Sequence, residues 1–489
     1  MDEKPTRLRF AGLGSRRGPI TWGQRFIMDI LAEISPDEHM LNLSMHIAIA
    51  AERTITDVRD GVLELVRAYE GLRTRFVPGE DGAFEQVVDG SGDYPLEVRQ
   101  AGDEPPSAVG ERLRATLAAR RFALESELPV RFGLVCTGQR PVLLIVVLAH
   151  ACLDGWSYKI ICRRLLSVLG PATDQPPLDG SAEQPIDRAA YEGSARGQRL
   201  TVDALGYLDE FRSRVGSAKP FPQRLRSEER PRYWWGQFES PAMAMAVPVL
   251  AARLRVPSAT LVLSSLLAVL GHRTGHRTWP FMLTVSNRFR PAVRSSVMHL
   301  TQSVPALVEL DPDMPVAELF QRTSRAVLRA ARFGQFDPVR AARLLRGDVP
   351  HRAVDHEYPM TFNYDRPIDA GADTAGHPAD QWDLDTLRRA SVGSSFVWLD
   401  TPTYELNRLY CHIHDLSGPA VISFKVDTRY LARADLVAAM FGAERLLVEQ
   451  VGRDLSLADV EPVTGVPAAS VPAVPPILRP QDDHFPVIS

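Results

Sequence analysis

The clearest hydrophobic pattern in the chain is an unbroken run of seven apolar residues over 142–148, most of them β-branched. Such a run predicts a strand that is buried on both faces. It continues through Ala149 to His150, and Asp154 and Gly155 follow before a helical pattern begins. The strand therefore delivers the His150 imidazole to a turn, in which Gly155 gives conformational freedom and Asp154 either holds the turn or pairs with a cation.

Strands and helices alternate along the chain in two halves of similar size. For the first half we predict an amphipathic helix over 56–73, capped at Thr56 and Asp57, strands over 130–136 and 141–148 joined by a hairpin-like turn, and a helix over 156–169. A stretch over 170–185 rich in proline, glycine and acidic residues predicts the exit from this half.

The second half is predicted to begin in a helical, charged region that contains Tyr233, Trp234 and Trp235. Helices are expected next over 258–270, ending at Gly271, and over 434–451, and strands over 282–285, 303–310 and 421–426. Residues 462–489 are rich in proline and poor in aromatic residues, which is typical of a flexible tail.

Composition limits the partners of the chain. With 489 residues, 45% hydrophobic and 24% charged, it can bury large cores, and its net charge of -4 argues against nucleic acid. The four cysteines lack metal-type spacing, the N-terminus has no apolar signal segment, and the apolar runs are too short to cross a membrane. We therefore expect a cytoplasmic protein with reduced thiols, no membrane partner and no metal. His412 and His414 could share a face of a strand as metal ligands, but no third ligand is evident, and we expect them to be core or surface residues.

A histidine held at the end of a strand has two interpretations. Its ordinary pKa lies near ~6.5, so a fixed His150 can accept a proton from a nucleophile at neutral pH or orient that nucleophile. It can equally be a satisfied polar residue. The spacing alone leaves both open.

The segment AHACLDGWS over 149–157 resembles the HHxxxDGWS signature of condensation domains from nonribosomal peptide synthetases, which are relatives of chloramphenicol acetyltransferase. Other segments resemble further motifs of that family in the right order, so that the resemblance spans residues 18 to about 455; they are 20–28, 70–76, 286–288, 300–305, 333–338 and 361–365. The resemblance implies an α/β fold, a pseudo-dimer of two acetyltransferase-like lobes in a V shape with a central cleft and tunnel. We expect the first lobe over 1–180, the second over 181–460 and the tail over 461–489.

The same resemblance implies an acyltransferase of natural-product biosynthesis, such as the making of antibiotics. We expect a free-standing condensation enzyme that transfers an acyl or aminoacyl group from the phosphopantetheine thioester of a carrier protein to an amine or hydroxyl acceptor, forming an amide or ester. The carrier protein would bind in trans and bring the phosphopantetheine, so that no cofactor is bound tightly. Two alternatives stay open, an acyltransferase that uses coenzyme A and a non-catalytic recruitment module.

The family motifs also imply roles for individual residues. His150 is the expected catalytic residue. Structural roles at the active site are implied for Asp154, which would pair with Arg288 from the other lobe, for Gly155 at the turn, and for Arg73 in an ion pair beneath the site. The substrate tunnel is expected to be lined by Asn363, Trp156, Ser157 and Gln302, and the Asn363 amide could donate to an oxyanion.

One position departs from the signature. The first histidine of the motif is Ala149 in this chain, whereas the second is kept as His150. Since successive side chains of a strand point to opposite faces, position 149 faces away from His150 and should serve packing more than chemistry. Activity therefore stays plausible without the first histidine.

Overall fold

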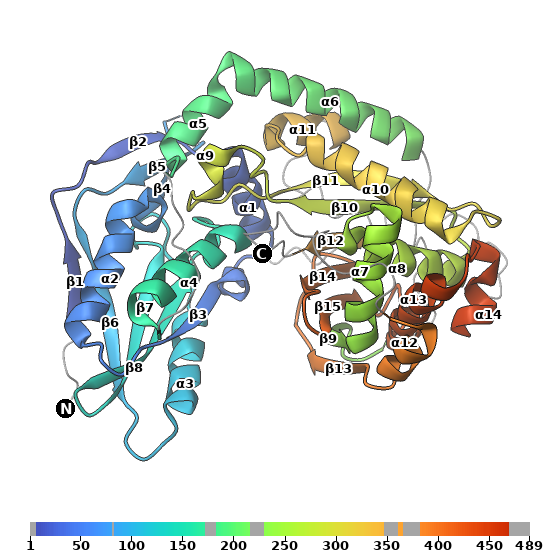
Figure 1. Ribbon diagram of the computed structural model, residues 1–489. Helices are drawn as coiled ribbons and strands as arrows, with labels where there is room; N and C mark the ends of the chain where they lie inside the picture. Colours follow the sequence, from blue (N-terminus) through green and yellow to red (C-terminus); the bar gives the residue numbers. More distant parts are fainter. Residues whose placement is uncertain are drawn as a thin grey trace.

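The computed structural model describes residues 6–80, 83–171, 182–215, 229–346, 360–364 and 382–468. These residues form a mixed α/β fold in which strands from the first part of the chain and strands from residue 233 onward belong to separate sheets (Figure 1). The predicted α/β class is confirmed. The expected border at 180/181 falls in 172–181, outside the described residues.

The first lobe is built on a five-stranded sheet in the order β1-β6-β7-β8-β3. A three-stranded sheet, β2-β5-β4, lies beside it. The bounds of the strands are β1 Thr6–Phe10, β2 Arg16–Pro19, β3 Leu43–Ala48, β4 Thr74–Pro78, β5 Phe84–Val88, β6 Gly92–Gln100, β7 Val130–Thr137 and β8 Arg140–Leu148. The bounds of the helices are α1 Trp22–Glu33, α2 Ile55–Ala68, α3 Pro106–Ala118 and α4 Gly155–Leu169.

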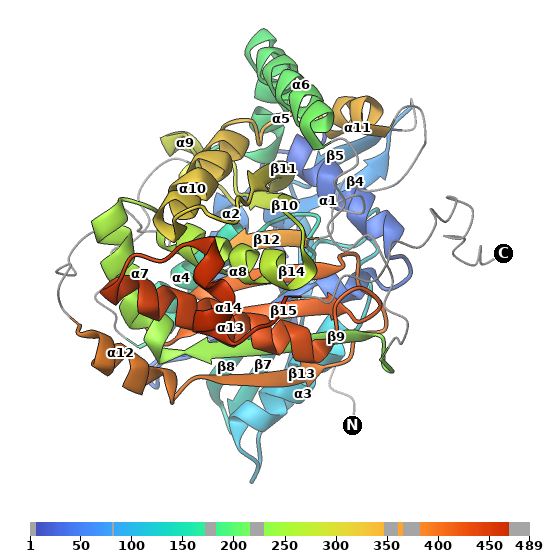
Figure 2. The same cartoon turned by 90° about the vertical axis from the view of Figure 1, so that its right-hand side faces the viewer.

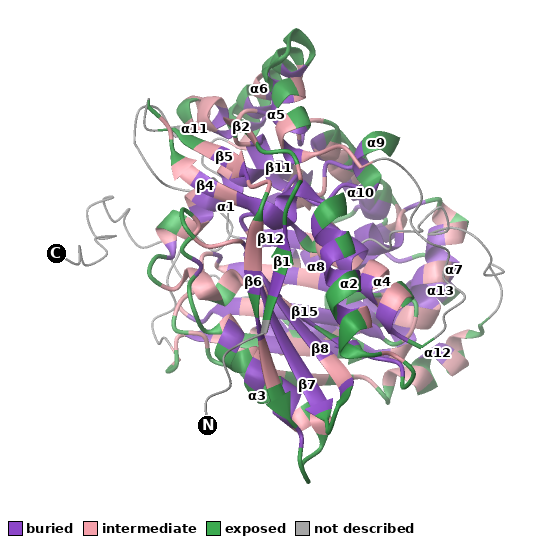
Figure 3. Ribbon diagram, turned by 90° about the vertical axis from the view of Figure 1, so that its left-hand side faces the viewer, coloured by how far each residue is buried: buried purple, intermediate pink, exposed green. Residues whose placement is uncertain are grey.

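Strand β8 lies inside the first lobe and is covered on both faces, as its hydrophobic run predicts (Figure 3). Successive side chains of β8 point to opposite faces of the sheet and pack in two different hydrophobic cores. Leu144 and Val146 pack in the core that includes α2 and α4, whereas Ile145, Val147 and Ala149 pack in the core that includes α3. The strand is therefore rigidly placed, and its C-terminal end points to a fixed position.

The second lobe is built on a seven-stranded sheet in the order β11-β10-β12-β14-β15-β9-β13. Helices α7, α8, α10 and α13 pack against this sheet, and α12 packs against α7 and α13 (Figure 2). The bounds of the strands are β9 Tyr233–Ser240, β10 Thr278–Val285, β11 Gln302–Glu309, β12 Met360–Tyr364, β13 Ser395–Asp400, β14 Leu409–Asp415 and β15 Ala420–Asp427. The bounds of the helices are α7 Pro241–Leu254, α8 Ser258–Thr274, α9 Pro291–Arg294, α10 Val316–Arg332, α11 Pro338–Arg346, α12 Leu384–Ser391, α13 Arg433–Gly452 and α14 Val460–Thr464.

Two further helices connect the lobes along one edge (Figure 1). Helix α5 (Pro185–Gly193) packs against β2 of the first lobe, and α6 (Ala195–Val215) packs against β11 of the second. The chain therefore bridges the two lobes through consecutive helices.

The structure corrects several of the predicted elements. Tyr233, Trp234 and Trp235 begin strand β9, which pairs with β15 and β13, rather than a helix. Aromatic side chains favour strands, and the alternating burial of β9 uses them on both faces of the sheet. Helix α8 continues through Gly271 to Thr274 and ends at Gly275, whose φ of 71° suits a left-handed cap.

Smaller differences concern the ends of two segments. Helix α2 is capped by Thr54, with Asp57 completing a capping box, rather than at Thr56. The predicted tail over 461–489 begins inside helix α14, and its part from residue 469 onward lies outside the described residues.

Among the described residues no single helix is long and apolar enough to cross a membrane. The pair α7 and α8 reaches that length and composition only together, with a bend of 104° between them. Most of their residues are buried in the core of the second lobe.

Candidate active site

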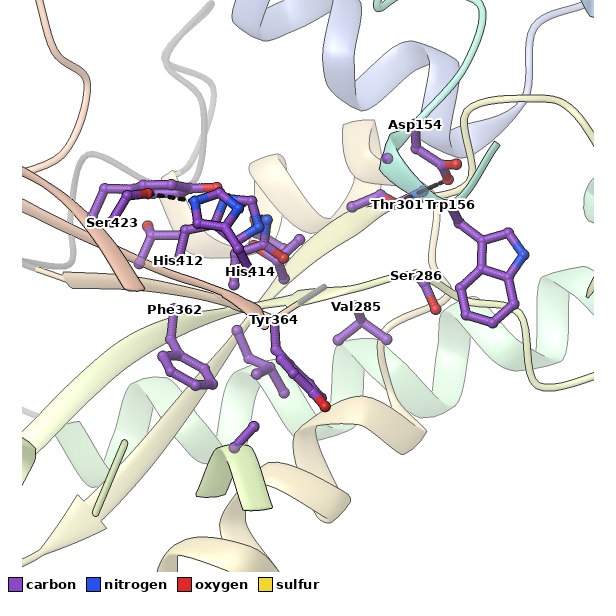
Figure 4. Close-up of a pocket in the computed structure, with 18 of the residues that line it drawn as sticks. Asp154, Trp156, Val285, Ser286, Thr301, Phe362, Tyr364, His412, His414 and Ser423 are labelled. Carbon is purple, nitrogen blue, oxygen red and sulfur yellow. Dashed lines mark hydrogen bonds between the residues drawn. The ribbon is translucent and has the colours of Figure 1, made fainter. Parts of the chain in front are cut away.

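A cavity of about 1320 Å³ lies between the two lobes. The first lobe contributes residues of α1, of the turn after β8, where His150 lies, and of the start of α4, where Trp156 lies. The second lobe contributes residues of β10, β12, β14 and β15 (Figure 4). Pockets for small molecules are typically roughly 300–1,000 Å³, so this cavity has room for two reacting groups.

His150 lies at this cavity, in the turn that follows β8. Its Nδ1 is 2.8 Å from the carbonyl oxygen of Leu153. Because a carbonyl oxygen only accepts hydrogen bonds, Nδ1 carries the proton of the neutral ring and Nε2 is left as an acceptor. Burial lowers the pKa of His150 below its ordinary value of 6.5, which favours the neutral ring.

Ala149 points away from this cavity. Its side chain is 2% exposed and packs in the apolar core that also holds Ile145 and Val147. The position that carries the first histidine in the family signature is therefore part of a packed layer in this chain.

Asp154 is the N-cap of α4 and reaches across to the second lobe. Its Oδ1 accepts from the backbone N–H of Ser157 at 3.0 Å and from Arg288 Nη2 at 2.8 Å. Its Oδ2 accepts from the backbone N–H groups of Leu300 at 3.0 Å and Thr301 at 3.2 Å. Burial by itself raises the pKa of Asp154, but the Arg288 charge and these hydrogen bonds outweigh it and hold that pKa well below its usual range.

Arg288, in the segment after β10, is the partner of Asp154 that the motif resemblance implies. Both side chains of the pair are 1% exposed. Arg288 also donates to the carbonyl oxygens of Val293 at 2.8 Å and Met298 at 3.0 Å. The pair thus joins the turn after β8 to the segment that leads into β11.

Three more of the expected residues line the cavity. Gly155 is the first residue of α4, and Trp156 follows it, with its ring Nε1 donating to the carbonyl oxygen of Arg294 at 2.8 Å. Asn363 lies on β12, and its amide donates to the Tyr410 hydroxyl at 3.1 Å.

Two residues expected in the tunnel do not line the cavity. Ser157 is completely buried, and its hydroxyl contacts Asp154 at 2.9 Å and the Met298 carbonyl oxygen at 2.8 Å. Gln302 is 1% exposed and donates to the Phe336 carbonyl oxygen at 2.9 Å. Strand alternation explains Gln302, because its neighbours Thr301 and Ser303 line the cavity while its own side chain points the opposite way.

Arg73 ends the 3₁₀ turn over Glu70–Arg73 and does not line the cavity. Its Nη1 donates to the carbonyl oxygens of Asp89 at 2.7 Å and Gly14 at 2.9 Å, and its Nη2 lies 3.7 Å from Glu70 Oε1. These contacts are structural, since they tie the small sheet of the first lobe to the turn before β4.

His412 and His414 were expected in the core or on the surface, but both line the cavity from β14 (Figure 4). Their ring centroids are 4.0 Å apart, and His414 Nε2 is 2.8 Å from the Ser423 hydroxyl. Within the described part of the chain no group of three potential metal ligands is present.

His299 is a cavity residue for which the sequence gives no periodic or motif signal. It is 2% exposed, precedes the matched segment 300–305, and its ring centroid is 5.0 Å from that of His150. Burial, together with the neighbouring His150, lowers the pKa of His299 to about 3. Two neutral imidazoles therefore lie side by side at the cavity.

With this geometry, the chain can be placed in a family. A family model for the condensation domain matches residues 19–337, and the chain belongs to that family. Condensation domains of nonribosomal peptide synthetases typically transfer acyl or peptidyl groups in amide or ester formation between carrier-bound substrates.

Curated relatives are larger synthetases. The chain is 27% identical over 387 residues to phosphinothricin tripeptide synthetase PhsC of Streptomyces viridochromogenes, which covers 76% of this chain and 33% of the synthetase. It is 27% identical over 274 residues to N-(5-amino-5-carboxypentanoyl)-L-cysteinyl-D-valine synthase of Amycolatopsis lactamdurans, covering 55% of this chain and 7% of that protein. The chain thus spans a third or less of the length of these relatives.

Solved structures show the same fold. The condensation domain from Monacolin K polyketide synthase MokA superimposes with a TM-score of 0.70 at 16% identity, over 91% of this chain and 99% of that one. The first condensation domain of the calcium-dependent antibiotic synthetase, in complex with a substrate analogue, gives 0.65 at 15% identity, over 91% and 98%. The SgcC5 protein from Streptomyces globisporus gives 0.63 at 18% identity, over 89% and 99%.

Proposed function

We propose that this chain is a condensation enzyme of natural-product biosynthesis. It transfers an acyl or aminoacyl group from the phosphopantetheine thioester of a carrier protein to an amine or hydroxyl acceptor. One observation carries the proposal: His150, at a cavity between two lobes, has its Nδ1 fixed by the Leu153 carbonyl oxygen and its Nε2 left as an acceptor.

The reaction that fits this geometry is attack of the acceptor on the thioester carbonyl carbon. The new C–N or C–O bond forms from the lone pair of the acceptor, and the C–S bond breaks to release the pantetheine thiolate. His150 Nε2 takes one proton from the acceptor and returns it to the thiolate, so that protons balance and the ring is neutral again.

Holding the two reactants in position in the cavity also accelerates the reaction. A thioester needs little activation, and holding both reactants in line contributes up to roughly 7–11 kcal/mol to lowering the barrier. A general base adds typically about 10²–10⁴-fold. The phosphopantetheine belongs to the carrier protein, and the proposal needs no further cofactor.

A recruitment module without catalysis is the second candidate, and Ala149 favours it because the family signature has histidine there. The packing of Ala149 supports the enzyme instead, since that side chain lies in an apolar layer behind the strand and contributes nothing to the cavity. A coenzyme A acyltransferase would use the same thioester chemistry and differs only in the donor.

One experiment separates the three. Purified protein is incubated with acyl and aminoacyl groups presented on a carrier protein, on free pantetheine and on coenzyme A, each with amine and alcohol acceptors. The proposal predicts condensed product by mass spectrometry, fastest from the carrier. Equal rates from coenzyme A would assign the coenzyme A reaction, and carrier binding without product from any donor would assign the recruitment role.

A further inference from the structure

His299 has a buried ring nitrogen for which the described residues offer no hydrogen-bond partner. Its Nδ1 makes no hydrogen bond within the described part of the chain, although the residue is only 2% exposed. A buried polar atom without a hydrogen-bond partner destabilises the folded protein. Neither the family signature nor the proposed role of His150 accounts for this imidazole.

The backbone around His299 is held on both sides. The Met298 carbonyl oxygen accepts from Arg288 and from the Ser157 hydroxyl, and the Leu300 N–H donates to Asp154 Oδ2. The His299 carbonyl oxygen itself accepts from the Thr21 hydroxyl at 3.2 Å. The buried ion pair therefore fixes the segment that carries His299, and it does so beside His150.

The two nitrogens of His299 differ in their surroundings. Nδ1 is inaccessible to solvent and has no hydrogen-bond partner among the described residues, whereas this is not so of Nε2. His299 is one of the residues that line the cavity. A buried N–H without a partner is rarer in proteins than a buried acceptor without one. We therefore assign the lone pair of the neutral ring to Nδ1 and its proton to Nε2.

We infer that His299 is a second catalytic residue, whose Nε2–H donates to the thioester carbonyl oxygen as that oxygen becomes an oxyanion. The inference rests on the proposed function of the site. When the acceptor attacks, the carbonyl π electrons move onto oxygen, and they return when the C–S bond breaks, so His299 donates a hydrogen bond and keeps its proton throughout. His150 takes the proton of the attacking amine or alcohol, and His299 donates a hydrogen bond to the thioester carbonyl oxygen. The centroids of the two rings are 5.0 Å apart.

Asn363 was expected to offer a donor for the oxyanion. Its amide nitrogen has two N–H donors and uses one of them for the Tyr410 hydroxyl on β14. His299 is in ring contact with His150. Of the two, His299 is the donor adjacent to the base.

The test measures transfer from the acyl pantetheine thioester that wild type turns over fastest, with a matched amine and alcohol as acceptors. His299→Phe keeps an aromatic ring and removes the N–H donor, and we expect kcat to fall on the order of 10²-fold with KM nearly unchanged. The loss should be equal for amine and alcohol, because both react with the same carbonyl. His299→Gln, which restores an amide donor, should recover part of the rate.

The matched control is His46→Phe, because His46 is exposed on β3 and lies outside the cavity; it should retain the wild-type rate. Three results for His299→Phe would overturn the inference and leave the role of His150 intact. They are a lower rate with the amine only, a higher KM with kcat unchanged, and a rate within 3-fold of wild type in folded protein. Absence of turnover by wild type with every donor would instead contradict the proposed function, and the inference would fall with it.

Discussion

Asp154 and His299 lie in one hydrogen-bonded region and are both nearly inaccessible to solvent. They differ in their hydrogen bonds, because the polar atoms of Asp154 have partners and Nδ1 of His299 has none among the described residues. Each Asp154 oxygen accepts several hydrogen bonds, one of them from the Arg288 guanidinium. His299 Nδ1 has no partner in the described residues. Satisfied groups specify structure, whereas an unsatisfied group beside a reactive one is retained at a cost to stability.

The residues of the site fall into a group that holds two segments together and a group that lines the cavity. Asp154, Arg288 and Ser157 bind the turn after β8 to the segment before β11. His150 and His299 project from these two segments onto the cavity. The first group should therefore govern mainly the stability of the protein, and the second group should govern the rate of transfer.

The largest expected effect on stability follows from breaking the ion pair. Asp154→Ala or Arg288→Ala leaves a buried charge unpaired and should lower the free energy of unfolding by about 3–5 kcal/mol. The double variant should lose less than the sum of the two. Denaturant unfolding of all four proteins measures the coupling.

The matched control is an exposed pair on α6, Asp209 and Arg212, 2.7 Å apart with both side chains more than half exposed. Its coupling should be about 0–1 kcal/mol. Additive losses for Asp154 and Arg288 would show that their contact does not stabilise the protein.

Ala149 tests whether the altered signature position serves packing. Because its side chain fills a layer with Ile145 and Val147, Ala149→His should lower the free energy of unfolding by about 1–3 kcal/mol without raising the transfer rate. Ala48→His, at an exposed position of β3, serves as the control. If wild type is inactive on loaded carriers while Ala149→His gains activity, the substitution is disabling and the recruitment role is the better account.

Burial of His299 predicts that the stability of the protein depends on pH. Its pKa is about 3 in the folded protein against 6.5 ordinarily, so below pH 6.5 the unfolded chain binds more protons. The neutral buried ring therefore contributes fully above pH 6.5, and its contribution is lost as pH falls toward 3. At pH 5.5 the loss is about 1.4 kcal/mol. Wild type should lose this stability relative to His299→Phe between pH 7.5 and 5.5, measured by denaturant unfolding; parallel pH curves would contradict the burial argument, and His46→Phe should track wild type.

Much of the fold and part of the site follow from local pattern. The apolar run before His150 specifies a strand buried on both faces, and motif order places Arg288 where Asp154 can reach it. The strand that contains Trp234 and the wall of the cavity depend instead on tertiary contacts. Trp234 lies in a strand because β15 and β13 pair with its segment, although charged residues flank it.

The cavity wall shows the same limit. Gln302 was expected in the tunnel from its place in a motif. The pleat of β11 instead points its side chain away from the cavity, and the neighbouring Thr301 and Ser303 line the cavity. His299 has no periodic signal because its placement comes from hydrogen bonds to residues more than 130 positions away in sequence, Asp154 and Ser157 among them. Such a contact is fixed only when the lobes are assembled.

The proposed mechanism requires that the His150 imidazole accept the proton of the acceptor during acyl transfer. Single-turnover measurement with a carrier protein loaded with the acyl group tests this requirement. His150→Ala should lower the rate of transfer by at least ~10²-fold while thermal unfolding shows a folded protein, and His46→Ala should leave that rate unchanged. A His150→Ala rate close to that of wild type would contradict the account.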